Sequence, residues 1–195
     1  MSPLIFLILF PLCIAVLAAV LPLAITLRRI VGVIANGILC AVPVYLLVTY
    51  LDQGPAYFHL ESHVVNIFML AVEFFIAAFI IYISIRAKRY LPVLLVAVQS
   101  VMMLIFEVTA GSSMHIEHSL FVDKFSIIMA LIVGIIGSAI CLYAIGYLPE
   151  YHEHHKEVKD RRRYFAFLMY LFLSAMFGII FSNNLMWVYF FWEIT

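Results

Sequence analysis

The chain has 195 residues, of which 67% are hydrophobic and only 11% are charged. Soluble domains carry about 25% charged residues, so this composition excludes a soluble enzyme and indicates an integral membrane protein. The formal net charge is zero and gives no indication of nucleic-acid binding. We expect residues 1–195 to form a single membrane domain, because the length leaves no room for a separate soluble one.

The apolar runs predict an all-α membrane protein, a multi-pass helical bundle with about six full transmembrane helices and an incomplete seventh. The N-terminal run lacks the positive segment of a cleaved signal peptide, so we expect it to be retained. Pro22 and Pro43 are expected to kink the first two helices. The predicted helices cover residues 3–27, 30–51, 64–85, 91–108, 123–148, 164–182 and 184–195.

Basic residues occupy alternate connections between these helices. The first, third and fifth connections hold every Lys and Arg except Lys124, which lies at the edge of a helix. The positive-inside rule therefore predicts a prokaryotic cell (inner) membrane protein with its N-terminus outside and these connections in the cytoplasm. The ten residues are Arg28, Arg29, Arg86, Lys88, Arg89, Lys156, Lys159, Arg161, Arg162 and Arg163.

Small residues recur every fourth position in two of the predicted helices. Such stripes let helix backbones approach closely in lipid, which predicts close helix packing inside a bundle or against a partner subunit. The stripes are Ala130, Gly134 and Ser138 in one helix and Ser174, Gly178 and Ser182 in another.

The histidines fall into three groups, and the cysteines have no metal-binding spacing. Two outer pairs have helical spacing that suits metal binding or titration near neutral pH, but they are expected to be interfacial polar residues. A third histidine group lies in a mixed-charge cytoplasmic connection that we expect to be solvated. The cysteines lie in apolar runs and are read as packing residues, and no nucleotide-binding or iron–sulfur motif is present. These residues are His59 and His63, His115 and His118, then His152, His154 and His155, and Cys13, Cys40 and Cys141.

Three glutamates interrupt the apolar runs, and these are the candidate proton-translocation residues: Glu193 first, then Glu73 and Glu107. Acidic side chains inside a bilayer are rare and usually functional, although a neutral Glu held by an interhelical hydrogen bond is the structural alternative for each. Gln99 is a possible hydrogen-bond partner of Glu73. No Lys or Arg lies at mid-membrane depth, so a cationic partner of Glu193 is expected after Thr195 or in another subunit.

Four segments of the second half resemble a known family in order and spacing. They are FVDKFSIIM (121–129), YAIGYL (143–148), RRYFAFL (162–168) and FSNNLMWVYFFWE (181–193). They are similar to the antiporter-like large membrane subunits of respiratory complex I, of multi-subunit cation/proton antiporters and of membrane-bound hydrogenases of the formate hydrogenlyase type. The resemblance implies that Glu193, in the Trp-Glu pair, is a proton-relay carboxylate whose lysine partner lies on a later, broken helix.

The resemblance also divides the chain and ranks its functions. Residues 1–51 correspond to the first two helices, residues 64–108 are an extra helix pair without family counterparts for its glutamates, and residues 121–195 begin the antiporter-like core. Asn183 stands where the family often has Asp.

The expected function is proton or cation translocation in a redox-driven complex, complex I-like or hydrogenase-type. The alternatives are a Na⁺/H⁺ antiporter subunit, and an N-terminal fragment or split subunit with an assembly role only. No cofactor is expected in this chain. Redox cofactors are expected in peripheral partner subunits, and other membrane subunits are expected to complete the helix that ends at Thr195.

Overall fold

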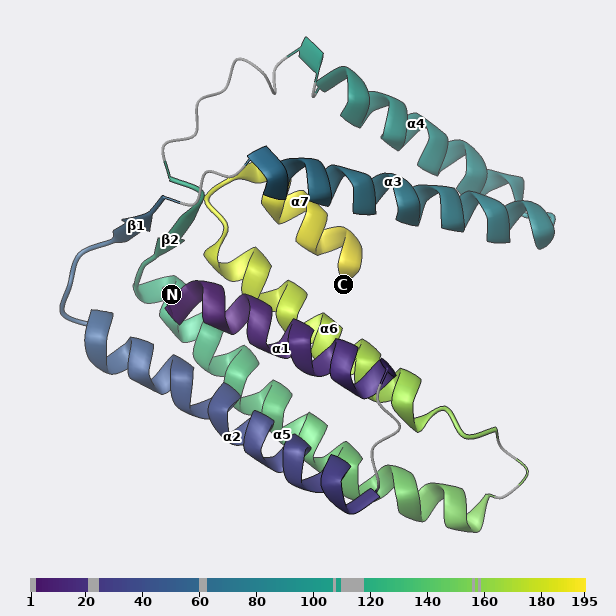
Figure 1. Cartoon of the computed structure of the whole chain (residues 1–195). Helices are drawn as coiled ribbons and strands as arrows, with labels where there is room; N and C mark the ends of the chain where they lie inside the picture. The colour runs from purple at the N-terminus through teal and green to yellow at the C-terminus, as the bar shows by residue number, and fades with distance from the viewer. Residues whose placement is uncertain are drawn as a thin grey trace. The chain divides into compact units, whose positions relative to one another are not determined.

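A computed structural model describes residues 3–20, 25–59, 63–106, 108–109, 118–155, 157 and 159–195. Within these ranges most residues are helical, and two three-residue strands and short turns connect the helices (Figure 1). The elements are α1 (Pro3–Val20), α2 (Ile25–Tyr50), β1 (Ala56–Phe58), α3 (His63–Arg86), α4 (Tyr90–Phe106), β2 (Leu120–Val122), α5 (Lys124–His154), α6 (Arg162–Phe181) and α7 (Leu185–Ile194).

Five of these helices, α1, α2, α3, α5 and α6, are long and apolar enough to cross a membrane, and α4 and α7 are shorter apolar helices. The expected all-α, multi-pass membrane fold is confirmed. The fold divides into two compact units, one formed by residues 1–58 and 120–195 and the other by residues 59–119.

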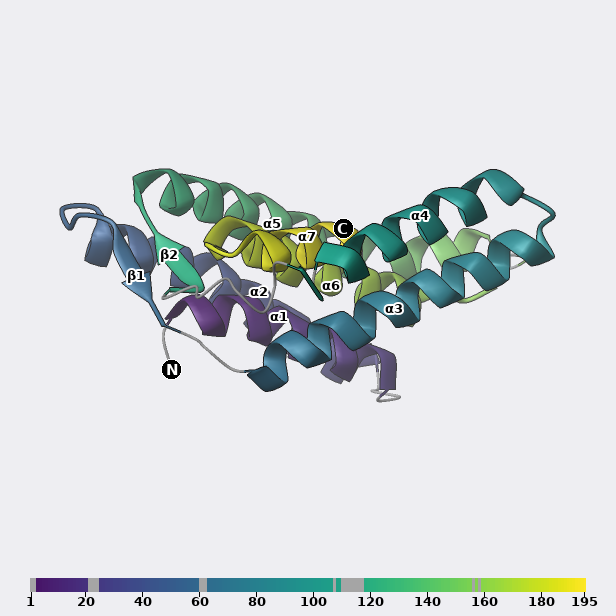
Figure 2. The same cartoon turned by 90° about the horizontal axis from the view of Figure 1, so that it is seen from above.

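In the first unit, α6 is the central helix and packs against α1, α5 and α7, while α2 packs against α1 and α5 (Figures 1 and 2). Both predicted small-residue stripes are buried in these contacts. At Gly134 a side chain would meet Leu39 O at 2.8 Å, so glycine lets α5 lie directly against α2. Ser174 Oγ donates a 2.7 Å hydrogen bond to Ile8 O, which joins α6 to α1.

The two strands bracket the second unit. Ala56 pairs with Val122 and Phe58 with Leu120 in an antiparallel ladder, and Leu120 forms a further bridge with Ser182. The chain therefore leaves the first unit and returns to it at neighbouring points, as an inserted segment would. The second unit is an antiparallel pair, α3 and α4, joined by a tight turn in which Lys88 has φ 55°.

Two predicted boundaries differ from the structure. Arg28 and Arg29 lie in the first turns of α2, not in a connection, since a helix continues through basic residues whose long side chains extend toward water. The 31-residue α5 runs on to His154, so His152 and His154 belong to a helix and not to a loop. Its length of about 46 Å exceeds the ~30 Å hydrocarbon core. The predicted kink at Pro22 lies outside the described residues, whereas Pro43 is inside α2.

Candidate ion-translocation site

The position of Glu193 is set by α7, which begins with a side-chain cap. Asn184 accepts a 2.9 Å hydrogen bond from the backbone N–H of Met186 and so satisfies one free donor of the first turn. Apolar residues at helical spacing then turn one face of α7 toward the protein interior. These buried residues are Trp187, Phe190 and Phe191.

A glycine on the neighbouring helix allows α7 to dock. A Cβ at Gly178 would lie 2.5 Å from both Cδ1 and Cδ2 of Phe191, so the ring rests on bare backbone of α6. The C-terminal end of α6 is closed by Ser182, whose Oγ donates a 2.6 Å bond to Gly178 O. Helices α6 and α7 are therefore in close contact where Phe191 of α7 meets Gly178 of α6.

Glu193 follows Phe191 by two residues on α7 and is half-buried. One turn earlier, Tyr189 donates a hydrogen bond from its hydroxyl to Glu193 Oε1 at 2.9 Å. The spacing of four residues places both side chains on one ridge of α7. A carboxyl group held by a hydroxyl in an apolar helix has the chemistry to take up and release a proton.

A second polar element crosses the core of the same unit and was not identified from the sequence. The amide Nδ2 of Asn36 donates a 3.1 Å hydrogen bond to the hydroxyl oxygen of Tyr170, and both residues are buried. Asn36 lies about 16 Å along α2 from its first residue, deep in the bundle. A signal was available, because Asn36 is the one amide side chain in the 26-residue α2.

The first residues of α5 form a well-defined cap. Asp123 Oδ1 accepts bonds from the hydroxyl of Ser126 at 2.6 Å and from its backbone N–H at 2.7 Å. These two hydrogen bonds hold the pKa of the Asp123 carboxyl below its usual value. Asp123 is therefore ionised at neutral pH, and its charge is used to cap the helix.

The remaining predicted glutamates belong to the second unit. Glu73 is 7% exposed and lies on α3, as a buried carboxyl group. Gln99 on α4 is exposed, and its pairing with Glu73 stays a prediction. Glu107 lies outside the described residues.

The structure brings together one histidine from each predicted outer pair. The rings of His59 and His118 lie edge to face with centroids 6.4 Å apart, although the residues are far apart in sequence. His115 lies outside the described residues, as does the side chain of His63. Among the described residues no group of three or more His, Cys, Asp or Glu has metal-binding geometry.

Part of the chain is similar to known membrane proteins. Residues 108–165 match the family model described as NADH-ubiquinone oxidoreductase (complex I), chain 5 N-terminus. Over 83 residues the chain is 35% identical to a Na⁺/H⁺ antiporter subunit of Alkalihalophilus pseudofirmus, a match that covers 43% of this chain and 9% of that protein. Over 121 residues it is 25% identical to the chloroplastic NAD(P)H-quinone oxidoreductase subunit 5 of Aethionema grandiflorum, covering 62% and 15% respectively.

A further relative, a Na⁺/H⁺ antiporter subunit of Staphylococcus haemolyticus, is 37% identical over 76 residues, which cover 39% of this chain and 8% of that protein. No solved structure gives a significant match. The matches thus span less than a sixth of each relative and fall on part of this chain. For that part, the resemblance to antiporter-like membrane subunits of complex I and of cation/proton antiporters is confirmed.

Proposed function

We propose that this chain is part of a proton- or cation-translocating membrane subunit in which Glu193 is a proton-relay carboxylate. The observation that carries the proposal is the setting of Glu193 on α7, an apolar helix docked on α6 with Tyr189 bonded to the carboxylate. The similarity to Na⁺/H⁺ antiporter subunits and to a quinone oxidoreductase subunit supports the same reading.

Proton translocation requires a side chain that stays in place while its protonation state changes. A carboxyl group in the low-dielectric contact between two helices takes up or releases a proton when a nearby charge alternates between two positions. The Tyr189 hydroxyl holds Glu193 in one rotamer and can either donate or accept a hydrogen bond. The pair can therefore bond to the ionised form and to the protonated form of the carboxyl.

The test is Glu193→Gln in the assembled complex that contains this chain, with ion uptake measured in sealed vesicles. Glutamine keeps the shape and a hydrogen bond but cannot carry a proton, so translocation is expected to fall by at least tenfold. Glu193→Asp, which keeps the carboxyl group, is expected to retain partial activity.

Glu153→Gln is the matched control, because Glu153 is an exposed carboxylate in the last turn of α5. This variant is expected to pump at the normal rate. Normal translocation by Glu193→Gln in a fully assembled complex would remove Glu193 from the mechanism.

The energy source distinguishes two forms of the proposal. In a redox-driven complex, complex I-like or hydrogenase-type, peripheral partners with redox cofactors supply the energy, and ion uptake requires an electron donor. In a Na⁺/H⁺ antiporter, the kind of protein that the 35% identical relative is named for, proton movement follows an imposed Na⁺ gradient. Vesicle assays with a donor alone and with a gradient alone separate the two.

We further propose that the chain lies in a prokaryotic cell membrane with its N-terminus outside. The end of the first unit that carries Arg28, Arg29 and Arg162 would then face the cytoplasm. In intact cells, an impermeant maleimide is expected to label Asn183→Cys and not Lys159→Cys, since these exposed residues flank opposite ends of α6. The reverse pattern would invert the orientation.

A further inference from the structure

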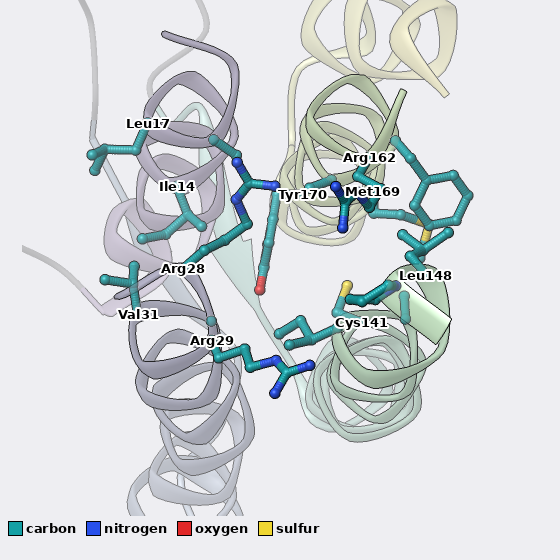
Figure 3. A pocket seen from close by; sticks show the side chains of 17 residues that line it. Ile14, Leu17, Arg28, Arg29, Val31, Cys141, Leu148, Arg162, Met169 and Tyr170 are labelled. Atoms are coloured by element: carbon teal, nitrogen blue, oxygen red, sulfur yellow. The ribbon is translucent and has the colours of Figure 1, made fainter. Parts of the chain in front are cut away.

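The first unit contains a pocket between the ends of four helices. Residues of α1, α2, α5 and α6 line it, and it has a volume of about 90 Å³. Figure 3 shows Arg28, Arg29 and Arg162 arranged around the space, with Tyr170 and Cys141 directed into it. Basic and apolar groups therefore meet in one cavity at a helix end.

The charged part of the pocket has an excess of positive charge. Arg28 lies close enough to Arg162, Arg163 and Asp160 for their charges to interact. Asp160 is engaged by Arg162, which donates from Nε at 2.9 Å and from Nη2 at 2.7 Å. One carboxylate thus faces several guanidinium groups. The pocket end is complementary to an anion.

The inner part of the pocket is apolar. Apart from the arginines, the Tyr170 hydroxyl and the Cys141 thiol, the side chains that line it are apolar, including Leu17, Ala144 and Ala166. Tyr170 is already bonded to Asn36. A free inorganic anion gains nothing from such walls, whereas a molecule with an anionic head and a hydrocarbon tail fits both parts.

We propose that this pocket binds an anionic phospholipid of the surrounding membrane, with its phosphate among Arg28, Arg29 and Arg162 and a segment of one acyl chain against the apolar wall. Basic pockets between transmembrane helices are suited to anionic headgroups. The arginines lie at helix ends, where a headgroup phosphate lies in a bilayer. Most of the lipid remains in the bilayer, because the pocket is too small to enclose it.

The experiment measures the lipid retained by the purified full chain. The protein is reconstituted in equal amounts of phosphatidylglycerol and phosphatidylcholine, exchanged into detergent, and analysed by native mass spectrometry. Selective retention of phosphatidylglycerol is expected. The double variant Arg28→Gln/Arg162→Gln removes two arginines. It is expected to weaken retention by roughly 30-fold, because each arginine lost removes one electrostatic contact with the anionic headgroup.

Two further variants separate charge from cavity. Arg86→Gln/Arg89→Gln removes two arginines that do not line the pocket, and it is expected to retain phosphatidylglycerol as the wild type does. Ala166→Phe keeps all the charges and fills the apolar part, so it is expected to lose the lipid. This variant keeps the test valid if the double arginine variant does not fold.

Four results would overturn the proposal. The first is equal retention of phosphatidylglycerol and phosphatidylcholine. The second is equal loss in the pocket and control arginine variants, which would mean a diffuse charge effect. The third is displacement of the phospholipid by millimolar inorganic phosphate, which would identify a site for a free anion. Unchanged retention in Ala166→Phe would place the lipid elsewhere.

Discussion

The contact between Gly178 and Phe191 makes the docking of α7 testable by a single methyl group. Gly178→Ala places a Cβ 2.5 Å from Cδ1 and Cδ2 of Phe191. Carbon atoms in contact normally lie about 3.5–4.0 Å apart, so the ring must move by about 1 Å or more. Since Phe191 is on the buried face of α7, the helix that holds Glu193 must move with it.

The magnitude follows from the cost of overpacking, about 1–3 kcal/mol. Alanine also favours a helix over glycine by up to about 1 kcal/mol, which offsets part of this cost. Gly146→Ala in α5 receives the same propensity gain without a clash, because nothing lies within 4 Å of its Cβ. The difference between the two variants therefore isolates the clash. It corresponds to about a 5- to 150-fold decrease in docked α7.

Tryptophan fluorescence is the assay, because the only two tryptophans of the chain, Trp187 and Trp192, both lie on α7. Trp187 is 4% exposed and Trp192 is 71% exposed. In a Trp192→Phe background, quenching by brominated lipid reports Trp187 alone. Quenching is expected to rise in Gly178→Ala and to stay unchanged in Gly146→Ala. Equal, low quenching in both would refute the docking of α7 through this contact.

Three further predictions concern stability. Tyr170→Phe leaves the Asn36 amide buried without its acceptor and is expected to lower the free energy of unfolding by about 1–3 kcal/mol. Asn36→Leu/Tyr170→Phe is expected to recover part of the lost stability, which thermal unfolding measures. Asp123→Ala is expected to cost about 1 kcal/mol by removing the α5 cap. Because the folded pKa of Asp123 is lowered, its contribution to stability is present above the unfolded value near 3.9 and is lost as pH falls through the lower folded pKa. Denaturation from pH 6 down to about 2, compared with Asp123→Asn, measures this loss. Replacing residues 59–119 by Asn-Gly is expected to keep the first unit folded, since a two-residue turn can close β1 onto β2. If Trp187 is no longer protected from quenching in this variant, the second unit is required for folding.

The candidate site was partly predictable because its signals are local. A glutamate in an apolar run is visible in the sequence, and so is a tyrosine one helical turn before it. The capping role of Asn184 also follows from residue type and position. The close approach of Phe191 was not predictable, since a small-residue stripe indicates packing without naming the partner.

The helix boundaries show a different limit. Hydropathy ends a predicted helix where charges begin, so Arg28 and Arg29 were assigned to a connection and the last turns of α5 to a loop. Hydrogen bonding continues a helix through such residues when their side chains can reach water. The backbone N–H of His155, for example, donates to Tyr151 O at 3.0 Å at the end of α5.

By itself the sequence determined the membrane class, the order of the apolar helices, their small-residue faces and the candidate carboxylate Glu193, because each depends on residues a few positions apart. Only the tertiary structure decided that Asn36 meets Tyr170, that β1 pairs with β2 across an inserted helix pair, and that three arginines surround one pocket. These contacts join segments tens to more than a hundred residues apart. Such pairings depend on which faces of the helices come together, and periodicity along one segment does not specify its neighbour.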